Sequence, residues 1–592
     1  MFYFEDFIMM NLNASLAMQT NQHLLQQVQK VHQKLEDLRL RLNEPIVPLT
    51  NEAILHLSTE LQPLYKALVM YNLDEFISRN LETALWNDCF KTPLTRYGRT
   101  DKNLFNLMIE SGVGFYLGLI QDIGVNFDIS FITNTPPTSK LYCTTSMLNN
   151  HFIKPSKSSI YFIIQNCLLH VGDLLRYRGS SYPEAIKMYE KSAAVCPSNG
   201  YPYHQMGLTQ LVIATTTENA HLMDELVSCL YYFARSLAVS NRYLPAFQSI
   251  ENLIKTKVEV TKQLPKNQEM LRQFMVSIHE NSKTANLYQM MCSVIATEHK
   301  ISASTLVKMI VIALWNNWRN QFTTNSLDII ACILNTVIQA ASVVVDFQPQ
   351  STLCLPHLKL ILEWMNWHCD NAAMPYLYSK LSVGKLVGVL NYLQTGNHLA
   401  QSSPGSWVLE AILPEEKKLI GFIPLDYSVC FNAGSSAGAI EPPTPIGTPV
   451  NSQPPRQAML GGHLLSEDKD AALSQSLRIH RIVAIALKLA SNKRCFMYDG
   501  VKFVEKTATP VPTQIQQPSR RNVALQSIFR TANVEVETQD LSPTSSFIPS
   551  NTTLPAMTAP GSLTTTTNLT TSHDFFRSIW TPDTENTESN WN

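Results

Sequence analysis

Two eleven-residue segments of this chain follow one pattern, and that repetition constrains the fold more than any other feature of the sequence. AIKMYEKSAAV at 185–195 and CLYYFARSLAV at 229–239 share an aromatic residue, a serine and an alanine, so that Tyr189 matches Phe233 at an offset of 44 residues. Small residues let paired helices approach closely while aromatic rings fill the space beside them, as in tetratricopeptide repeats, whose period is roughly 34 residues. We expect the excess of about ten residues to lie in an extended turn around 214–223.

Helical patterning covers most of the chain up to about residue 396. Apolar residues recur at spacings of one, three and four in segment 13–44, which predicts an amphipathic helix that ends at Pro45. Since no run of strands is predicted, we expect an all-α fold, in which tetratricopeptide-like repeats are followed by a solenoid of α-helical hairpins. Further helical stretches are expected at about 51–71, 73–91, 103–123, 159–255 and 266–396, and loops at 92–104 and 132–158.

The composition of the chain changes near residue 432. Residues 432–470 are rich in Gly, Ser and Pro and predict a disordered insertion, and the Thr-, Pro- and Ser-rich residues 507–592 predict a disordered tail. Between them, residues 471–506 predict one apolar helix followed by a short pair of strands. We therefore expect a repeat domain at 13–260, a hairpin domain at 261–431 that residues 471–506 complete, the insertion and the tail.

Charge, cysteine content and hydropathy argue against several classes of protein. The net charge is -1 and no basic stripe is present, so direct binding to nucleic acid is not expected. The 11 cysteines include no CxxC pair, which argues against a disulfide framework or a structural zinc site and favours the cytosol or the nucleus. The apolar run from Ile329 to Val345 is interrupted by polar residues, and it predicts a buried core helix rather than a membrane span.

The sequence contains no motif for catalysis, a cofactor or a metal in a context that would support it. Phosphate-binding loops and the zinc-protease and serine-hydrolase signatures do not occur where a strand, a turn and a helix could support them. The paired acids Glu415 and Glu416 stand beside Lys417 and Lys418, which predicts a solvated loop. Histidines such as His170 occur singly and are predicted to be packed or surface residues. We therefore expect no enzyme, no cofactor and no metal site.

Several strings of the sequence resemble the Est-one and SMG family of adaptors in nonsense-mediated mRNA decay. They occur in the order in which the family has them, they span most of residues 13–506, and the SMG-seven type is the most similar, followed by the SMG-five type. The resemblance implies a 14-3-3-like repeat domain at 13–260, followed by helical hairpins. The strings are LWNDCFK at 85–91, SGVGFYLGLIQDIGVNFDI at 111–129, GDLLRYR at 172–178, PSNGYPYHQMG at 197–207, YYFARSLAV at 231–239, LPEEKKLIGFIPL at 413–425 and RIHRIVAIALKLA at 478–490.

The resemblance also implies a phosphoserine-binding groove between helices. GDLLRYR is similar to the family's phosphate-binding helix and supplies Arg176 and Tyr177, and LWNDCFK is similar to the helix that supplies a lysine, Lys91. The chemistry is suitable, because phosphoserine carries about two negative charges, arginine offers a planar fork of donors and lysine adds a point charge.

Three other residues compete for a place in this groove. Arg178 is two residues from Arg176, about 200° around a helix, so the two arginines cannot both face one groove well. Arg235 and His204 could also line the groove, and the sequence does not decide between them.

The tail contains an aromatic segment, HDFFRSIWTPD at 573–583, that the resemblance implies is a recruiting motif. Its apolar residues lie four apart in two pairs, as in a short helix that docks in a groove of a partner, and they are Phe575, Phe576, Ile579 and Trp580. In the family, tails of the SMG-seven type recruit deadenylation or decapping machinery.

The resemblance as a whole implies a cytoplasmic adaptor, with shuttling to the nucleus left open. It would bind the phosphorylated Up-frameshift RNA helicase, pair with a related SMG protein through its 14-3-3-like domain, and recruit mRNA decay enzymes or a phosphatase. The alternative is a telomerase-associated protein of the Est-one type that binds telomeric RNA or DNA. A nuclease is a third class, because one branch of the family carries a C-terminal PIN domain, and the Thr/Ser/Pro-rich tail argues against it.

Overall fold

The structure is a computed structural model, and it describes the helical part of the chain. The predicted helix at 13–44, apart from isolated positions between 22 and 33, lies outside the described residues, as do the insertion at 432–470 and the tail with its recruiting motif. The described residues are 51–97, 101–127, 129, 154–216, 221–261, 264–282, 286–298, 301–347, 354–395, 412–425, 471–492 and 495–506.

The first group of helices packs against the repeats through α6, which contacts α8. Asp101 caps the start of α6, since its carboxylate accepts hydrogen bonds from the backbone N–H groups of Asn103 at 2.9 Å and Leu104 at 3.0 Å. In the part of the chain that is described, α6 is the helix long and apolar enough to cross a membrane by length and composition, a test that core helices also meet. The group consists of α2 (Asn51–Tyr71), α3 (Leu73–Ser78), α4 (Leu81–Trp86), the π-helical turn η1 (Asn87–Lys91), α5 (Thr92–Tyr97) and α6 (Lys102–Asn126).

Two predictions for this group were partly wrong. The single helix expected at 73–91 is interrupted before α4 at Asn80, whose φ of 55° is left-handed, a conformation that asparagine tolerates better than most residues. The loop expected at 92–104 instead begins with helix α5, which continues directly from η1. The π-helical turn, in which the N–H of Thr92 donates to the carbonyl of Asn87, comes immediately before Pro93, which has no N–H to donate.

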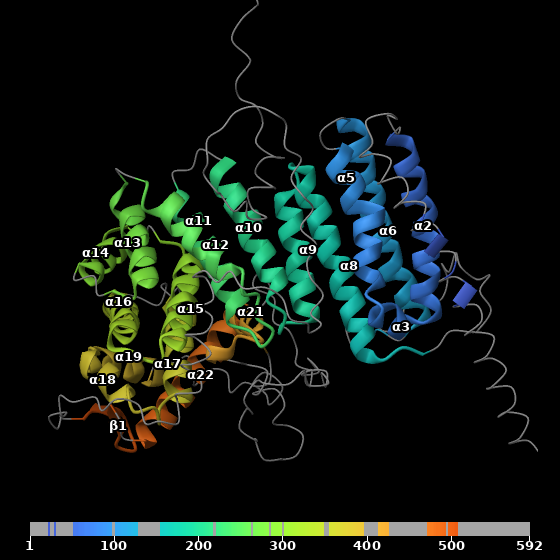
Figure 1. Ribbon diagram of the computed structural model, residues 1–592. Coiled ribbons are helices and arrows are strands. Elements are labelled where there is room, and N and C mark those ends of the chain that lie inside the picture. The colour runs from blue at the N-terminus through green and yellow to red at the C-terminus, as the bar shows by residue number, and fades with distance from the viewer. Residues whose placement is uncertain are drawn as a thin grey trace, which may run out of the picture. The chain divides into compact units, whose positions relative to one another are not determined.

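The repeat predicted from the sequence is confirmed by two hairpins with the same close contact. A Cβ added to Gly172 would lie 2.5 Å from a ring carbon of Tyr189, and one added to Gly207 would lie 2.5 Å from a ring carbon of Phe233. The two glycines are 35 residues apart, close to the usual period, so the excess length lies after Gly207, within the second hairpin. The extended turn expected at 214–223 was partly wrong, because α10 continues to Thr216 and α11 begins at Leu222, so most of the excess length is helical. The hairpins are α8 (Lys157–Arg178) with α9 (Tyr182–Val195), and α10 (Tyr201–Thr216) with α11 (Leu222–Leu237), and α8, α9 and α10 follow one another in space (Figure 1).

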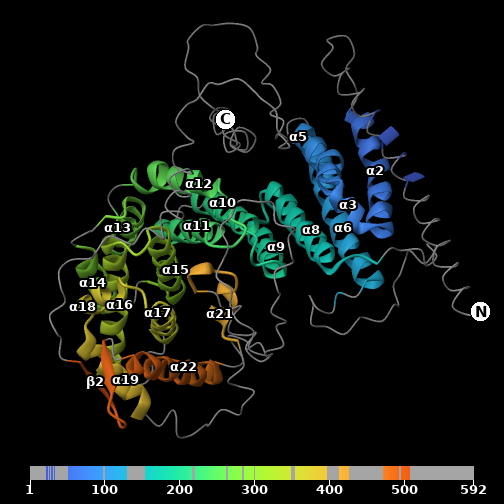
Figure 2. The same ribbon diagram turned by 60° about the horizontal axis from the view of Figure 1, so that its bottom comes forward.

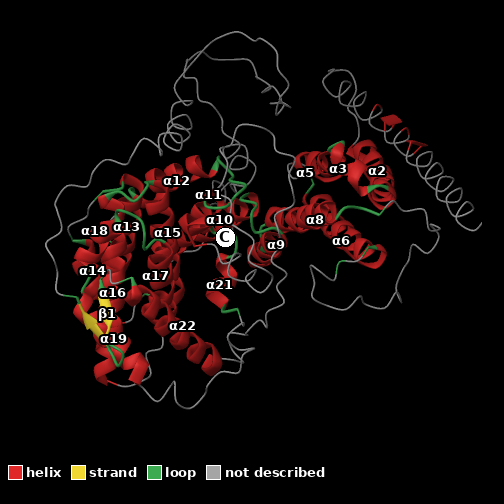
Figure 3. Ribbon diagram, turned by 90° about the horizontal axis from the view of Figure 1, so that it is seen from below, coloured by secondary structure: helices red, strands yellow, loops and turns green. Residues whose placement is uncertain are grey.

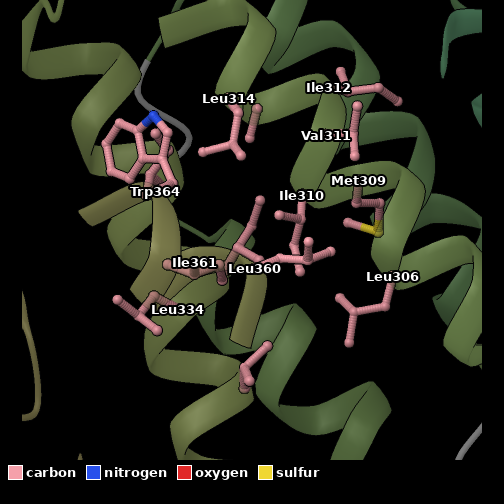
Figure 4. Packing of buried hydrophobic residues seen from close by; sticks show 14 of the residues in the cluster. Leu306, Met309, Ile310, Val311, Ile312, Leu314, Leu334, Leu360, Ile361 and Trp364 are labelled. Atoms are coloured by element: carbon pink, nitrogen blue, oxygen red, sulfur yellow. The ribbon is translucent and has the colours of Figure 1, made fainter. Parts of the chain in front are cut away.

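A second series of helices continues the repeats and shares one apolar core with them. That core includes Ala214 and continues to Phe503, and Figure 4 shows its centre, where Ile310 of α15 lies beside Leu360 of α17 and Leu314 lies on the side of Trp364. The run around Ile329 lies in α16 and is a core helix, as predicted. The division expected at residue 260 stays a prediction. The helices are α12 (Ala246–Leu253), η2 (Ile254–Val258), α13 (Lys266–Glu280), α14 (Leu287–Glu298), α15 (Ala303–Arg319), α16 (Thr324–Phe347), α17 (Leu355–Trp367), α18 (Met374–Lys380) and α19 (Val383–Thr395).

The closing segment has the predicted helix and strand pair. Phe496 pairs with Glu505 and Tyr498 with Phe503 in antiparallel register, and the pair lies beside α19 (Figure 2), where the side chain of Asn391 bonds both the N–H and the carbonyl of Phe503. In Figure 3 this pair stands out against the helices that make up nearly all of the described chain. The elements are α21 (Pro414–Leu419), the 3-10 turn η4 (Ile423–Leu425), α22 (Ala471–Ser491), β1 (Phe496–Tyr498) and β2 (Phe503–Glu505).

The prediction of a solvated loop at the paired acids was wrong. Both carboxylates are buried on α21, where Arg478 of α22 forms two 2.8 Å hydrogen bonds with Glu415, and Lys359 of α17 lies 2.5 Å from Glu416. Burial alone would raise the pKa of Glu416, but the charges of Lys359 and Arg481 outweigh it and hold that pKa below its usual range. The partners are distant in sequence, so the neighbouring lysines were a misleading signal.

We predict that the close helix contacts make Gly172 and Gly207 sensitive to one added methyl group. Gly172→Ala and Gly207→Ala should each lower the free energy of unfolding by about 1–3 kcal/mol, because Tyr189 and Phe233 are fully buried and have little room to move. Chemical denaturation measures this effect.

A matched control is Gly388→Ala in α19, where an added Cβ meets nothing within 4 Å. It should raise the free energy of unfolding by about 0.5–1 kcal/mol, since alanine is the better helix former. Equal stability of all three variants would contradict this account of the repeat.

Candidate functional site

The last turns of α8 and the facing side of α9 hold a buried polar cluster around one carboxylate. Asp173 accepts a hydrogen bond from the hydroxyl of Tyr189 at 2.7 Å and another from Nη2 of Arg176 at 3.2 Å. The Nε of Arg176 donates to the hydroxyl of Tyr189 at 3.2 Å, which closes a triangle of three side chains. The guanidinium also lies over the ring of Tyr177, 5.0 Å from its centroid. Arg176 is therefore held in one orientation by three neighbours.

The charges in this cluster support one another. Burial alone would raise the pKa of Asp173, but His170, Arg176 and Tyr189 together outweigh it and hold that pKa below its usual range. Asp173 and Tyr189 in turn help to raise the pKa of Arg176, although burial opposes the rise. Asp173 is thus an anion and Arg176 a cation at neutral pH.

The cluster extends through His170 to the first group of helices. Nε2 of His170 lies 3.0 Å from a carboxylate oxygen of Glu82, and its ring stacks on Trp86 at 4.2 Å with an angle of 11° between the planes. Nδ1 lies 3.9 Å from Asp173, too far for a hydrogen bond but close enough for charge attraction. Burial lowers the pKa of His170, and the two carboxylates outweigh this effect, so the pKa lies above its usual value.

The three predicted phosphate-binding residues differ in exposure. Arg176 keeps 13% of its side-chain surface, Tyr177 is buried, and Lys91 is exposed at the end of η1. Side chains from the two cation-bearing segments converge on Gly112 of α6, where an added Cβ would touch both Leu174 of α8 and Phe90 of η1. Their role in binding phosphate stays a prediction.

The second repeat provides an internal comparison for the site. With Gly172 matched to Gly207, Asp173 corresponds to Leu208 and Arg176 to Leu211, and both leucines pack on the apolar core. Burying polar groups costs free energy unless they are bonded, and leucine stabilises a hairpin at these positions without that cost. The repeat therefore does not need Asp173 and Arg176 for its packing, which makes them candidates for function.

The other basic candidates do not line a groove with Arg176. Arg235 is fully buried and donates to the hydroxyl of Tyr203 at 3.0 Å and to the carbonyl of Ile420 at 3.1 Å. His204 is buried beside Ser249, with its Nε2 3.0 Å from the hydroxyl oxygen. The suggestion that these two residues line the groove was therefore wrong.

The expected divergence of Arg176 and Arg178 is visible in their partners. Arg178 keeps 42% of its side-chain surface and lies 3.5 Å from Glu110 of α6, whereas Arg176 faces α9. α8 ends directly after Arg178 at Gly179, whose φ of 77° suits glycine at a helix C-terminus.

Sequence reasoning missed most of this cluster, although the signals were present. Asp173 stands three residues before Arg176 and therefore on the same helix face. Tyr189 was noted only as the aromatic residue of the repeat, and His170 only as an isolated histidine. Within the described ranges, no group of three or more His, Cys, Asp or Glu residues could hold a metal ion.

Comparison with known families gives two matches that follow one another along the chain. A family model described as "Telomerase activating protein Est1" matches residues 80–181, which include Lys91 and Arg176. A second, described as "Est1 DNA/RNA binding domain", matches residues 185–428.

Two curated relatives from Danio rerio cover part of the chain. The nonsense-mediated mRNA decay factor SMG7 is 28% identical over 211 residues, which are 34% of this chain and 17% of that protein. The telomerase-binding protein EST1A is 24% identical over 218 residues, which are 34% of this chain and 13% of that protein. The chain therefore matches less than a fifth of the length of either relative.

Two solved structures match parts of the chain to different degrees. The structure titled "Crystal structure of Est1 and Cdc13" has a TM-score of 0.52 at 12% identity, covering 82% of this chain and all of that one. The structure of the C. elegans SMG5-SMG7 complex has a TM-score of 0.40 at 16% identity, covering 62% of this chain and 89% of that one. The first likeness agrees with the all-α repeat fold.

We predict that His170 contributes more to stability in mild acid than in alkali. A histidine with a raised pKa in the folded state stabilises fully below its unfolded pKa, about 6.5, and loses that contribution as the pH rises through the folded pKa. The difference in unfolding free energy between the wild type and His170→Gln should therefore be largest at about pH 6 and shrink toward higher pH. Denaturation at several pH values measures it, and a difference that grows with pH would contradict the assignment.

Proposed function

This chain belongs to the Est1 and SMG family, and from that premise we propose that it is an adaptor in nonsense-mediated mRNA decay that reads a phosphoserine on a partner protein. The partner we propose is the phosphorylated Up-frameshift RNA helicase. The chain would work without a catalytic step, in the cytoplasm, and would bring mRNA decay enzymes or a phosphatase to the message. The similarity to a relative named as a decay factor supports this choice.

The observation that carries the proposal is the oriented arginine on α8. Asp173 and Tyr189 hold the guanidinium of Arg176 in place, and the side chain is largely buried but keeps 13% exposure. An oriented guanidinium has lost its rotamer freedom in advance, so binding a phosphate requires little further ordering. The equivalent position of the second repeat is Leu211, so the cation is not explained by the packing of the repeat.

Lys91 completes the proposed site as the more mobile cation. Its exposed side chain extends from η1, next to Phe90. Phe90 and Leu174 of α8 both pack at Gly112 of α6. A lysine ammonium is a point charge on a flexible stem, suited to a second contact with a phosphate whose position the arginine sets.

We predict that Lys91→Glu in the full chain weakens binding of a peptide with phosphoserine followed by glutamine by at least about tenfold, the order of one lost charge-assisted hydrogen bond. The unphosphorylated twin peptide should bind weakly to the wild type and the variant alike. Isothermal titration calorimetry measures both.

The matched control is Arg178→Glu, which makes the same charge change at an exposed site two residues from Arg176. It should keep the preference for the phosphopeptide. Equal affinity of the wild type for both peptides would refute the phosphoserine-reader proposal.

A second part of the proposal is pairing with a related SMG protein through the outer face of α6. An exposed stripe repeats along this helix at spacings of three and four, and positions Gly114 and Gly118 face open space, since an added Cβ at either meets nothing within 4 Å. Two leucines on the stripe are largely exposed, at 61% for Leu107 and 44% for Leu117. These two leucines offer apolar surface on an outer helix face that a partner would bury.

We predict that Leu117→Glu reduces binding to such a partner by about tenfold or more, because a charge in an apolar interface loses its hydration. The control is Leu244→Glu, at another exposed leucine, on the segment before α12, which should leave binding unchanged. Co-purification followed by analytical ultracentrifugation measures the complex. Unimpaired pairing of Leu117→Glu would remove α6 from the interface.

The second candidate function is that of a telomerase-associated protein that binds telomeric RNA or DNA. The match of residues 185–428 to a model described as a DNA/RNA binding domain favours it, as does the similarity to a telomerase-binding relative. The net charge of -1 counts against it. Salt-dependent binding of a single-stranded telomeric oligonucleotide, with no preference for phosphoserine, would favour this second function.

A further inference from the structure

His170 occupies a junction between the two helices that carry the proposed phosphate-binding cations. Its Nε2 is bonded to Glu82 of α4 at 3.0 Å, and its ring stacks on Trp86 of the same helix. The ring of Tyr116 from α6 lies 5.2 Å from it on another side. The imidazole is thus enclosed by side chains of three helices, with only 8% of its surface exposed.

One end of this junction leads to Lys91. α4 ends at Trp86 and η1 begins at the next residue, so the residues that hold His170 belong to one continuous helical segment with Lys91. Trp86 and Phe90 lie one turn apart on it with ring centroids at 6.3 Å, and both are buried. Fixing Glu82 and Trp86 therefore fixes the segment from which Lys91 extends.

The other end of the junction leads to Arg176. His170 lies one turn before Asp173 on α8, and Asp173 accepts the hydrogen bonds that orient Arg176 and Tyr189. A chain of contacts therefore runs from Glu82 through His170 and Asp173 to Arg176. We refer to the bond between Glu82 and His170 as the α4–α8 bridge.

Packing alone does not require this bridge to be polar. In the second repeat Gln205 corresponds to His170. Among the described residues, no carboxylate from another helix bonds Gln205 as Glu82 bonds His170. Apolar groups of similar volume can stabilise a buried site as well as a bonded pair of titratable side chains, so the geometry that the pair fixes is a reason for its presence beyond stability.

We propose that His170 is a positioning residue for the phosphoserine site, and that the α4–α8 bridge holds the helix carrying Lys91 in register with the helix carrying Arg176. This inference rests on the proposed function and deepens it. In this proposal His170 lies outside the groove and controls the distance between the two cations. Once the bridge is lost, Arg176 keeps its own bonds to Asp173 and Tyr189, while the helical segment that carries Lys91 loses a bond that ties it to α8.

A double-mutant cycle tests this role in the full chain. In the wild type, Lys91→Met should weaken binding of the phosphoserine-glutamine peptide by about tenfold, the order of one charge-assisted hydrogen bond. In the His170→Gln background the same change should cost less than about threefold, because the segment that carries Lys91 is no longer tied to α8. Glu82→Gln should reduce the effect of Lys91→Met in the same way. If His170→Gln does not fold, the cycle is measured in the Glu82→Gln background instead.

His204→Gln is the matched control, since His204 is another buried histidine bonded through Nε2, but in the second repeat. In that background Lys91→Met should keep its full effect. An equal effect of Lys91→Met in the wild-type, His170→Gln and Glu82→Gln backgrounds would overturn the positioning role. A wild type that does not prefer the phosphopeptide would instead refute the proposed function itself, so the two failures are distinguishable.

Discussion

Tyr189 connects the packing of the first repeat with its polar cluster. Its ring fills the space left by Gly172, where no side chain would fit, and so sets how closely α8 and α9 approach. Its hydroxyl then reaches Asp173 and Arg176 at hydrogen-bond distance. The second repeat keeps the close contact with Phe233 in place of tyrosine, and it has leucines where the polar pair would stand. The difference between the two repeats is therefore one of chemistry rather than of architecture.

Buried charges recur in the structure where segments distant in sequence must be joined. Lys359, Glu416 and Arg481 connect α17, α21 and α22, and Glu82 and His170 connect α4 with α8. Such groups are costly to bury alone, so each holds its partner to one geometry. The first set joins the closing helix α22 to the rest of the helical series, and the second joins α4 to α8.

The sequence predicted the helices well because their signals are local. The first described helix was predicted at 51–71, which are its bounds in the structure, and the repeated aromatic and small residues predicted the two hairpins. The extra residues of the second hairpin were expected in a turn, and most of them instead extend α10 and α11. Features that depend on distant partners were not predictable in this way. Glu416 stands next to two lysines, yet its partners Lys359 and Arg481 are 57 and 65 residues away. The same limit hid the bond between Glu82 and His170, which lie 88 residues apart.

The central claim is that two cations from neighbouring helices bind the phosphate of one phosphoserine. A phosphorus NMR titration of the phosphopeptide, free and bound to the full chain, tests this claim directly. The second pKa of a free phosphoserine is about 6, and two cations beside the phosphate stabilise its doubly charged form. The account predicts that this pKa falls on binding. An unchanged or raised pKa in the bound peptide would contradict it.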